Sequence, residues 1–389
     1  MAIAIFGGTF DPFHDAHERI VRTVASLHYI DKVFVMPAGN PPHKPNQWIS
    51  FASYRLAMVE AAVKNINKTS VARYELQKRG RSYTVETIRH FKEKHKEDVY
   101  IVIGADSFLE IEEWYKYKEI LSLAKILVAR RPGHKGLKKH KKYLKDKYKA
   151  KVRFIDIEES SISSSLLRRE LENGDFSNPE LNDRVKRLIE NNKLYEKRNL
   201  EDIFTAKQID QLQDYERVML PHLSTYRAMH AVNTMYQAIY VAEKIGYDLW
   251  EAAVAGLLHD CAKEMNPKNY PDFLDWVDKS YIESEDLTHG PLGAYLLQPM
   301  FAIANPRIYD AIYYHTTLRE DFSQLEGILY LADKSEPSRT FSGVEKIRAK
   351  IEQDPKKALK KAIKNNNAKL EKRGKKVHPF TIDALQAFK

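Results

Sequence analysis

The stretch that decides the fold of the N-terminal half is Gly7-Gly8-Thr9-Phe10-Asp11-Pro12-Phe13-His14-Asp15-Ala16-His17, which follows the apolar run Ala2-Ile3-Ala4-Ile5-Phe6. This order predicts a buried strand, a glycine turn and the first turn of a helix. Glycines let the backbone approach an anion closely, and a helix N-terminus offers unpaired N–H groups and the positive end of the helix dipole. His14 and His17 lie on one face of that helix and can donate to the same phosphate chain. The pattern predicts a phosphate cradle, and it is neither a Walker loop nor the three-glycine dinucleotide fingerprint.

Over residues 1 to about 198, short apolar runs of β type alternate with helical patterns. Such alternation predicts an α/β domain with a doubly wound, Rossmann-like parallel sheet and helices on both faces. Ligands of these sheets bind beyond the carboxyl ends of the strands, where His14, Asp106 and the loop after Met36 would lie. The expected strands are Ile3–Phe6, Lys32–Met36, Val99–Gly104, Ile126–Ala129 and Val152–Ile155, and the expected helices include Tyr54–Val63, Val85–His95 and Leu166–Asn173.

Beyond about Asn199 the β-type runs stop and helical patterns follow one another. A chain of 389 residues is too long for one compact core, so two domains are expected. We place the first domain at residues 1–198 and the second, all-α, at residues 199–389. The helices expected in the second domain are Tyr226–Lys244, Leu249–Lys263, Gly290–Met300, Arg307–His315 and Leu325–Ser335.

The composition restricts the compartment and the kind of metal site. A single cysteine, Cys261, excludes an intrachain disulfide and a thiolate metal cluster. No apolar run reaches the roughly 18–20 residues that span a bilayer. The chain enters its first expected strand at once, without the charged segment and cleavage site of a signal peptide. These features predict a cytoplasmic protein with no membrane partner.

The net charge of +10 is concentrated in two stretches. Residues 134–153 hold ten Lys and Arg against one acid, and residues 343–378 hold thirteen against four, so each stretch is +9 and the remainder is about −8. The lysines are not interleaved with aromatic residues that could stack on bases. The pattern favours solvated helix faces that also attract phosphate over a nucleic-acid interface.

Three further segments of the first domain indicate nucleotide phosphates. Pro41-Pro42-His43-Lys44 places a cation on a loop stiffened by prolines, which suits a lid. Ile103-Gly104-Ala105-Asp106 ends a buried strand with a carboxylate that can bind ribose hydroxyls. Ser163-Ser164-Ser165 opens a helix that carries Arg168 one turn later, which makes a second anion site. The aspartate or the serines alone could be ordinary helix caps, but the ordered set favours nucleotide chemistry.

The Gly-Gly-Thr-Phe-Asp-Pro and His-x-x-His motif resembles the nucleotidylyltransferase superfamily. Within it, essentially all of residues 1–198 is similar to the bacterial nicotinate-nucleotide adenylyltransferase family. Two positions depart from the family pattern, because Ala16 stands where glycine is usual and Ser165 where threonine is usual. The motifs that carry this closer resemblance are Pro41-Pro42-His43-Lys44, Ser82-Tyr83-Thr84-Val85-Glu86-Thr87, Gly104-Ala105-Asp106, Trp114, and Ile162-Ser163-Ser164 followed by Arg168.

The resemblance implies a domain that joins AMP from ATP to nicotinate mononucleotide and releases pyrophosphate with magnesium, a step of NAD biosynthesis. Tyr83, Thr84 and Trp114 would form the nicotinate pocket, although Trp114 taken alone could be plain core. Such chemistry needs positioning and charge neutralisation rather than covalent catalysis. The resemblance assigns the ATP phosphates to His14, His17, Lys44 and Arg168, and further nucleotide contacts to Gly7, Gly8, Thr9, Phe10, Ser164 and, at the adenosine end, Asp106.

The helical half carries an adjacent His259-Asp260 pair at the end of an apolar run. A buried pair of this kind is costly unless a partner neutralises it, and a metal ion is such a partner. Four histidines and two aspartates offer only nitrogen and oxygen ligands, suited to iron, manganese or another divalent ion. Six ligands are too many for one catalytic ion with open water positions, and they fit two ions bridged by Asp260 and a hydroxide. The predicted ligands are His230, His259, Asp260, His289, His315 and Asp333.

The spacing of these residues resembles the HD-domain metal phosphohydrolases. The segments Asp333-Lys334-Ser335-Glu336-Pro337-Ser338-Arg339 and Val377-His378-Pro379-Phe380-Thr381 look like the subgroup that hydrolyses diadenosine tetraphosphate symmetrically to two ADP. The resemblance implies that the six residues are metal ligands and that Lys263 and Arg339 contact substrate phosphate. Taken singly, any one of the histidines could be a satisfied core residue.

The sequence predicts a bifunctional enzyme, and two alternatives stay open. The first domain could adenylylate another phosphorylated acceptor such as phosphopantetheine, and the second could hydrolyse another nucleotide such as guanosine tetraphosphate. The helical half could instead be a non-catalytic nucleotide sensor whose basic tail docks onto RNA. The sequence also leaves open the identity and oxidation state of the metals, the choice between nicotinate and nicotinamide mononucleotide, a homo-oligomer, and coupling between the domains.

Overall fold

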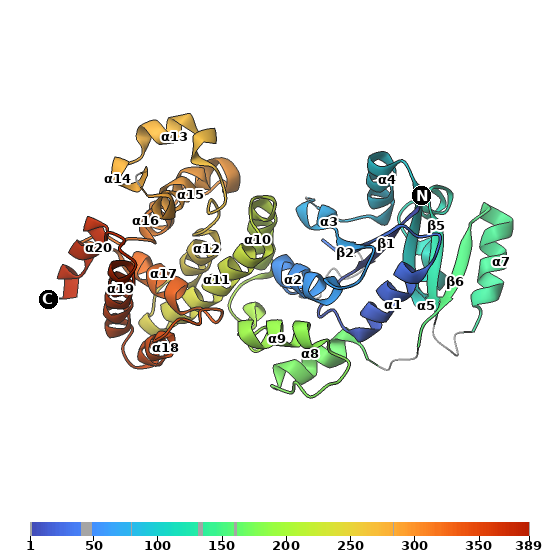
Figure 1. The fold of residues 1–389 in the computed structure, drawn as a ribbon, viewed down its shortest axis with the longest axis horizontal. Helices are drawn as coiled ribbons and strands as arrows, with labels where there is room; N and C mark the ends of the chain where they lie inside the picture. The colour runs from blue at the N-terminus through green and yellow to red at the C-terminus, as the bar shows by residue number, and fades with distance from the viewer. Residues whose placement is uncertain are drawn as a thin grey trace. The chain divides into compact units, whose positions relative to one another are not determined.

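A computed structural model describes residues 2–39, 49–78, 80–130, 135–158, 162–282 and 284–388. The chain divides into two compact units, which Figure 1 shows with their elements labelled. The sheet unit comprises residues 1–190 and 194–196, and the helical unit comprises residues 191–193 and 197–389. Asn192 belongs to the helical unit, where its side-chain oxygen accepts a hydrogen bond from Asn233 Nδ2 at 2.7 Å.

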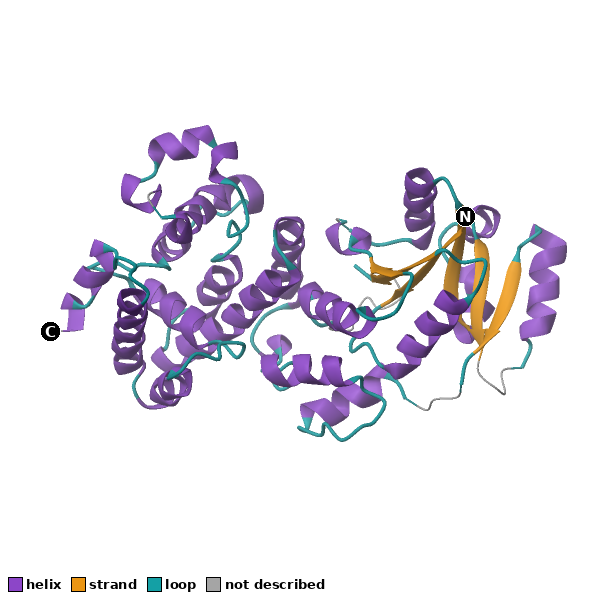
Figure 2. Ribbon diagram, in the orientation of Figure 1, coloured by secondary structure: helices purple, strands orange, loops and turns teal. Residues whose placement is uncertain are grey.

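The sheet unit is built on parallel strands in the order β3-β2-β1-β4-β5-β6, drawn in orange in Figure 2. The predicted doubly wound α/β fold is confirmed. The strand order reverses at β1, which pairs with β2 on one side and β4 on the other, so the carboxyl ends of β1 and β4 flank the crevice where such sheets bind ligands. The strands are β1 (Ala2–Gly8), β2 (Lys32–Pro37), β3 (Thr69–Val71), β4 (Asp98–Gly104), β5 (Lys125–Arg130) and β6 (Val152–Asp156).

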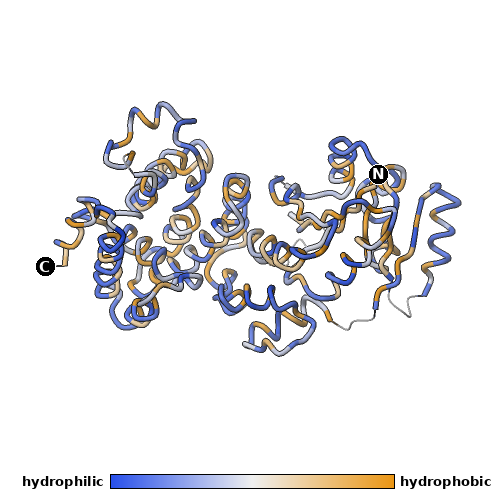
Figure 3. The backbone as a smooth tube through the Cα atoms, in the orientation of Figure 1, coloured by the Kyte–Doolittle hydropathy of each residue, from blue (hydrophilic) through white to orange (hydrophobic). Residues whose placement is uncertain are grey.

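The central strands are buried on both faces, which explains their nearly continuous apolar runs. Figure 3 shows these strands mostly in the hydrophobic colour. The edge strand β3 is three residues long and only half-buried, so the sequence offers no apolar run there and no strand is expected.

Helices cover both faces of the sheet. In α7 the first basic stretch forms a helix in which Leu137 and Leu144 are buried while Lys138 and Lys142 are exposed, as expected for a solvated helix face. The helices of this unit are α1 (Asp15–Ser26), α2 (Ala52–Val63), α3 (Tyr74–Gln77), α4 (Thr84–His95), α5 (Ala105–Leu109), α6 (Tyr117–Leu123), α7 (Leu137–Tyr148), α8 (Ser164–Glu172) and α9 (Asp183–Asn192), which ends in the helical unit.

The described residues of the helical unit contain helices and no strand, as predicted. The long helix α11 packs against both α12 and α17. Within the described part of the chain, no helix is both long and apolar enough to cross a bilayer. The helices are α10 (Ala206–Met219), α11 (Thr225–Ile245), α12 (Leu249–Leu258), α13 (Pro271–Trp276), α14 (Lys279–Ile282), α15 (Glu285–Phe301), α16 (Pro306–Tyr314), α17 (Gln324–Ser335), α18 (Val344–Gln353), α19 (Pro355–Lys372) and α20 (Pro379–Ala384).

Helix α12 ends earlier than the sequence predicts. The expected helix runs to Lys263, whereas the regular helix ends at Leu258 and the chain continues in tight turns. The Cys261 amide donates to the Leu258 carbonyl at 3.0 Å and the Lys263 amide donates to the Asp260 carbonyl at 2.9 Å, both three-residue bonds. Since these turns are tighter than an α-helix, Asp260 leaves the helical register and its carboxylate stays in the interior.

Gly256 lets α12 and α11 approach closely. A Cβ at this position would lie 2.7 Å from Met235 Cα and 3.0 Å from the Thr234 carbonyl oxygen, both backbone atoms of α11. Backbone atoms cannot move aside as the end of a flexible side chain can, so a larger residue at position 256 must separate the two helices. His230 lies on α11 and His259 follows α12, so this contact also sets the distance between the two rings.

We predict that Gly256→Ala destabilises the helical unit. In an open helix this change would stabilise by up to about 1 kcal/mol, but the overpacking at Met235 should reverse the sign and cost about 1–3 kcal/mol. Calorimetric melting of the full chain should show a fall of several degrees in the transition of the helical unit. The matched control is Gly104→Ala, where an added Cβ meets nothing within 4 Å. Equal melting of Gly256→Ala and the wild type would contradict the prediction.

Candidate functional sites

The turn after β1 requires glycine at position 8. A Cβ there would lie 2.6 Å from Cε1 of Phe10, whose ring is buried and whose backbone has a φ of 53°. Register places Gly7 beside Met36 and Gly8 beside Pro37, so the turn emerges at the carboxyl edge of the sheet. The backbone of this turn is therefore exposed to a ligand without a side chain in between.

The two predicted histidines lie against one another at the start of α1. His14 occupies the N-cap position, and its amide donates to His17 Nδ1 at 3.3 Å. The rings are stacked with centroids 3.8 Å apart. The His17 ring also lies 5.1 Å from the Phe10 ring and 5.2 Å from the Phe13 ring. Apolar packing thus fixes the orientation of His17, and both imidazoles share one end of the helix, as the spacing predicts.

Helix α8 is docked onto this turn from a point some 150 residues later in the chain. Arg168 donates to the Asp11 carbonyl at 2.5 Å, and Ser164 Oγ donates to the Pro12 carbonyl at 3.2 Å. Ser163 caps the helix by accepting from the Leu166 amide at 3.2 Å. The predicted second anion site therefore lies next to the first, and Arg168 is positioned beside the histidine turn.

Two buried residues that sequence reasoning did not assign hold the turn in place. The Asp11 carboxylate accepts from Tyr195 Oη at 2.7 Å, and burial raises the pKa of Tyr195 well above its usual value, which keeps the phenol a donor. Arg55 is buried and donates to the carbonyls of Thr9 and Ala38 at 3.1 and 2.7 Å. Asp11 belongs to the quoted motif, but no local pattern in the sequence singles out Arg55.

A cavity of about 640 Å³ opens beyond the carboxyl ends of β1 and β4. The Gly7–Thr9 turn forms one wall, and the predicted nicotinate-pocket residues Tyr83, Thr84 and Trp114 form another. The Tyr83 ring lies 4.5 Å from that of Tyr115, a lining residue that the sequence analysis does not assign. The cavity thus combines backbone amides, hydroxyls and aromatic faces, which suits a small aromatic ligand.

Glu75 adds a carboxyl group to the cavity wall. Its Oε1 accepts from Thr87 Oγ1 at 2.8 Å, and burial raises the pKa of Glu75. Both residues line the cavity. Thr87 ends the Ser82–Thr87 motif, although the sequence assigns it no role, and Glu75 stands in no motif.

Other predicted residues of this domain lie elsewhere. Asp106 is exposed in the first turn of α5, directly after β4. Lys44 lies outside the described residues. The described lining of the cavity includes neither the side chains predicted to bind anions nor the carboxylate predicted to bind adenosine. The Gly7–Thr9 turn is the part of the predicted phosphate cradle that lines the cavity. The predicted residues absent from that lining are Phe10, His14, His17, Asp106, Ser164 and Arg168.

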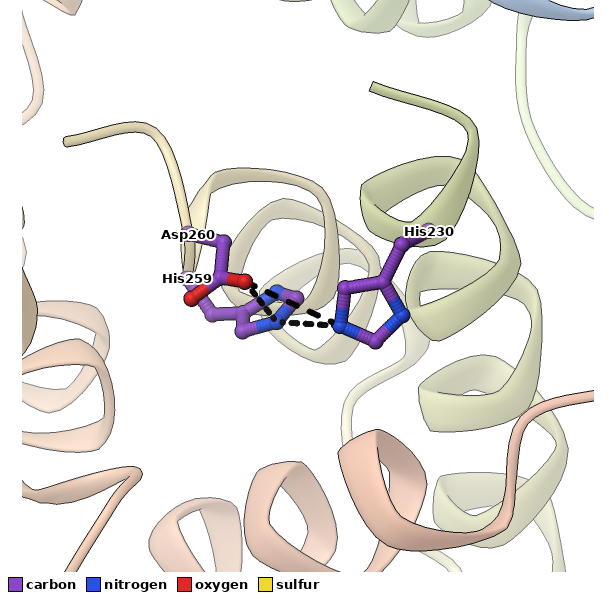
Figure 4. A group of neighbouring side chains, drawn as sticks. All are labelled: His230, His259 and Asp260. Carbon is purple, nitrogen blue, oxygen red and sulfur yellow. Dashed lines mark hydrogen bonds and ion pairs between the residues drawn. The ribbon is translucent and has the colours of Figure 1, made fainter. Parts of the chain in front are cut away.

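In the helical unit, the six predicted ligands converge from five helices and are all buried. His230 comes from α11, and His259 and Asp260 follow the last turn of α12, as Figure 4 shows. The others come from α15, α16 and α17, and they are His289, His315 and Asp333.

Asp260 lies between two pairs of histidines. Its Oδ1 is 3.0 Å from His289 Nε2 and 3.5 Å from His315 Nε2. Its Oδ2 is 3.7 Å from His259 Nε2 and 3.8 Å from His230 Nε2. The ligand atoms form two groups, each within 4.8 Å and each including this carboxylate. This geometry suits two neighbouring cation sites that share the Asp260 carboxylate.

Hydrogen bonds on the outer side of the rings fix which nitrogen faces inward. The Nδ1 atoms of His259 and His315 each lie 2.8 Å from the carbonyl oxygen three residues earlier. A carbonyl only accepts, so these Nδ1 atoms carry the proton and the Nε2 lone pairs point into the cluster. His230 Nδ1 lies 3.1 Å from Glu336 Oε1, the carboxylate–histidine arrangement that orients metal-binding imidazoles.

The inward-facing atoms fit a cation. His230 Nε2 and His259 Nε2 are 3.3 Å apart, and His289 Nε2 and His315 Nε2 are 3.1 Å apart. Facing lone pairs repel unless a proton or a metal ion lies between them. Burial lowers the pKa of His259 to about 3 and that of His289 to about 4, so both rings are neutral near pH 7. A neutral imidazole is the form that binds a metal ion.

The neighbouring thiol is not a ligand. Cys261 is buried directly after Asp260, and burial raises its pKa to about 12. A thiol that stays protonated is a poor metal ligand. The donor set is therefore nitrogen and oxygen, as the sequence predicts.

Four cations surround the cluster. Arg339 pairs with Asp333 Oδ1 and lies 3.0 Å from His230 Nε2, while Lys334 Nζ is 2.6 Å from Asp333 Oδ2. Asp333 Oδ1 is itself 3.1 Å from His230 Nε2, which brings this carboxylate to the same group. Cationic side chains around the cluster suit a ligand with a phosphate chain. The remaining two cations are Lys263, 3.0 Å from His289 Nδ1, and Arg227, 3.4 Å from Asp260 Oδ2.

The comparison with known proteins divides the chain in the same way as the structure. Residues 5–170 match the Cytidylyltransferase-like family model, and residues 227–338 match the HD domain model. A protein of Clostridium acetobutylicum named "Probable nicotinate-nucleotide adenylyltransferase" is 36% identical over 195 residues, covering 49% of this chain and 98% of that protein. A protein of the same name from Clostridium novyi is 38% identical over 172 residues, covering 43% of this chain and 86% of that protein.

Two solved structures are also similar. One, from Clostridium acetobutylicum, is described as a predicted HD superfamily hydrolase involved in NAD metabolism; it is 30% identical, covers 46% of this chain and 95% of its own, and has a TM-score of 0.43. The other, Plasmodium falciparum nicotinic acid mononucleotide adenylyltransferase complexed with NaAD, is 21% identical, covers 50% of this chain and 97% of its own, and has a TM-score of 0.44.

We predict that the helical unit binds two divalent ions per chain and that Asp260 is needed for both. After loading with Mn²⁺ and desalting, mass spectrometry should find two ions in the wild type, one in His289→Ala and fewer than one in Asp260→Asn, because Asp260 alone belongs to both ligand groups. The matched control is His222→Ala, an exposed histidine of the same unit. Retention of both ions by Asp260→Asn, or equal losses in the control, would overturn the assignment.

Proposed function

Because the chain belongs to the nicotinate-nucleotide adenylyltransferase family and carries an HD domain, we propose that it is a bifunctional enzyme. The sheet unit transfers AMP from ATP to the phosphate of nicotinate mononucleotide, giving nicotinate adenine dinucleotide and pyrophosphate. The helical unit hydrolyses diadenosine tetraphosphate symmetrically to two ADP.

The arrangement that supports the transferase is the Gly7–Thr9 turn between an aromatic cavity and an anion site. The mononucleotide phosphate attacks the α-phosphorus of ATP, one P–O bond forms, and the bond to pyrophosphate breaks. Both reactants are anionic, so the barrier consists largely of repulsion and misorientation. His14, His17 and Arg168 lower it by holding the phosphates of magnesium-bound ATP, with Lys44 as a further phosphate contact.

The acceptor base occupies the cavity beside Tyr83 and Trp114. Aromatic faces stack on the pyridine ring, and backbone amides near Thr84 donate to its carboxylate. Nicotinate carries a carboxylate where nicotinamide carries a neutral amide, so amide donors favour nicotinate mononucleotide. Asp106, at the carboxyl end of β4, binds the adenosine ribose in this proposal.

We predict that His17→Ala lowers the kcat of nicotinate mononucleotide adenylylation by on the order of 10²-fold, or about 2–4 kcal/mol in barrier, typical of a positioned electrostatic group. Product analysis with ATP, magnesium and either nicotinate or nicotinamide mononucleotide measures this and the acceptor preference. The matched control is His28→Ala, an exposed histidine of the same unit. His17→Gln checks that packing against Phe10 is not the cause. Unchanged turnover in His17→Ala would refute the role of His17 in holding the ATP phosphates. If the wild type prefers phosphopantetheine, that compound and not nicotinate mononucleotide is the acceptor.

The observation that supports the hydrolase is Asp260 facing two pairs of inward-pointing imidazoles. The six ligands would hold two divalent ions, which when bound lower the pKa of water and polarise a phosphoryl oxygen. Glu336 keeps His230 oriented, and the backbone carbonyls do the same for His259 and His315. Lys263 and Arg339 orient and neutralise the substrate phosphates.

We predict that Asp260→Ala abolishes hydrolysis of diadenosine tetraphosphate measured with Mn²⁺, whereas adenylylation by the same protein persists. Loss of only one activity separates a site effect from global misfolding. ADP should be the sole nucleotide product of the wild type, since symmetrical cleavage leaves two phosphates on each side. Normal hydrolysis by Asp260→Ala would refute the site. If the wild type hydrolyses guanosine tetraphosphate and not diadenosine tetraphosphate, the proposed substrate is wrong. If it binds metal but hydrolyses neither nucleotide, the helical unit is better explained as a nucleotide sensor.

A further inference from the structure

The C-terminal helices border a second cavity, of about 560 Å³, that the proposed reactions do not use. It lies among the end of α17, the start of α18 and one face of α19. We call it the lysine pocket. Four lysines line it, and none of its described lining residues is acidic. The lysines are Lys334, Lys346, Lys361 and Lys369.

Four cations around one cavity with no lining carboxylate favour a polyanionic ligand. Burial and the neighbouring charges of Arg373, Lys334 and Arg339 lower the pKa of Lys369, because a cation is less stable near other cations. Gly343, at the N-cap of α18, has a φ of 93° and lines the pocket, so the positive end of the dipole of this ten-residue helix lies at the pocket wall. An anion relieves the repulsion among the lysines and is attracted by that end of the helix dipole.

The other lining groups suit a nucleoside rather than a bare phosphate. Phe341 is half-buried, and Lys369 Nζ lies 5.6 Å from its ring centroid. The side-chain amides of Asn365 and Asn366 supply both donors and acceptors, which can pair with the edge of a base. An aromatic face, two amides and four ammonium groups match the base and phosphates of one nucleotide.

The lysine pocket adjoins the metal ligands through one shared wall. Lys334 lines the pocket, yet its Nζ also lies 2.6 Å from Asp333 Oδ2. Arg348, on the same helix as Lys346, donates to the carbonyls of Ser335 and Arg339 at 2.9 Å each. These bonds hold the loop between α17 and α18, which carries the groups that contact His230. A phosphate chain leaving the metal ligands past Arg339 thus meets Lys334 at the border of the pocket.

From these contacts we propose that the lysine pocket binds the second nucleotide of a dinucleoside polyphosphate, the one that departs on hydrolysis. The inference rests on the hydrolase function proposed above. In that reaction one P–O bond forms to a water oxygen and one breaks to the departing nucleoside diphosphate. The departing phosphate gains a negative charge, and a proton passes to solvent. The lysines stabilise that charge, so the pocket selects substrates with a nucleotide at both ends over mononucleotides.

The test uses the full chain with Lys346→Ala/Lys361→Ala. Neither lysine lies next to a metal ligand in the sequence, and removing two exposed or half-exposed ammonium groups should leave the fold intact. The matched control is Lys356→Ala/Lys364→Ala, two exposed lysines of α19 that do not line the pocket. We expect KM for diadenosine tetraphosphate with Mn²⁺ to rise about tenfold in the pocket variant only. Hydrolysis of bis(p-nitrophenyl) phosphate, which needs the metal ions but no second nucleotide, should not change.

An unchanged KM, or equal losses on both substrates, would overturn the proposal. A second measurement, of ADP binding without added metal, distinguishes a failure of the pocket proposal from a failure of the hydrolase proposal. Asp260→Asn should bind ADP as the wild type does, and the pocket variant should bind it about tenfold more weakly. If the wild type hydrolyses no diadenosine tetraphosphate, the hydrolase proposal fails, and the ADP comparison still decides whether the pocket binds a nucleotide. Equal ADP binding by the pocket variant and the wild type would overturn that too.

Discussion

The buried carboxylate of Asp260 is the constraint on which the helical unit depends. An ionised group in the interior costs several kcal/mol unless charges of the opposite sign surround it. Here each oxygen faces a pair of imidazole nitrogens, and the carboxylate and the rings form two groups that could each hold a cation. The early end of α12 keeps this carboxylate inside, and the Gly256 contact sets how far His230 lies from it. The backbone geometry at the end of α12 and at Gly256 therefore places the groups that could bind cations.

In the proposed function, the two units attract phosphate by different physical means. The sheet unit uses the backbone of a glycine turn, a helix N-terminus, two stacked histidines and an arginine, all held by hydrogen bonds around Asp11. The helical unit uses ligands for cations and a rim of lysines and arginines. A metal site depends on deprotonated ligands and on ion supply, whereas the glycine turn is formed by the fold alone.

Particular elements show how far sequence patterns extend. β1, β2, β4, β5 and β6 are predictable because strands buried on both faces need continuous apolar runs, and β3 is not, because an edge strand of three half-buried residues needs none. The six predicted metal ligands were proposed from the type and order of their side chains, and the structure brings them together. Arg55, Glu75 and the lysine pocket were not proposed, since a buried arginine, a lone glutamate and scattered lysines have no local pattern.

The sequence by itself determined the α/β and all-α character of the two halves, the glycine turn and the set of candidate ligands, since periodicity, turn chemistry and residue type are local properties. Only the tertiary structure decided which of these groups meet. It docks Arg168 on Asp11, gives Asp260 a histidine pair on each side, and closes the lysine pocket beside Asp333. Such contacts join residues tens to more than a hundred positions apart, and the packing of helices and strands, rather than any nearby sequence, sets the distances between them.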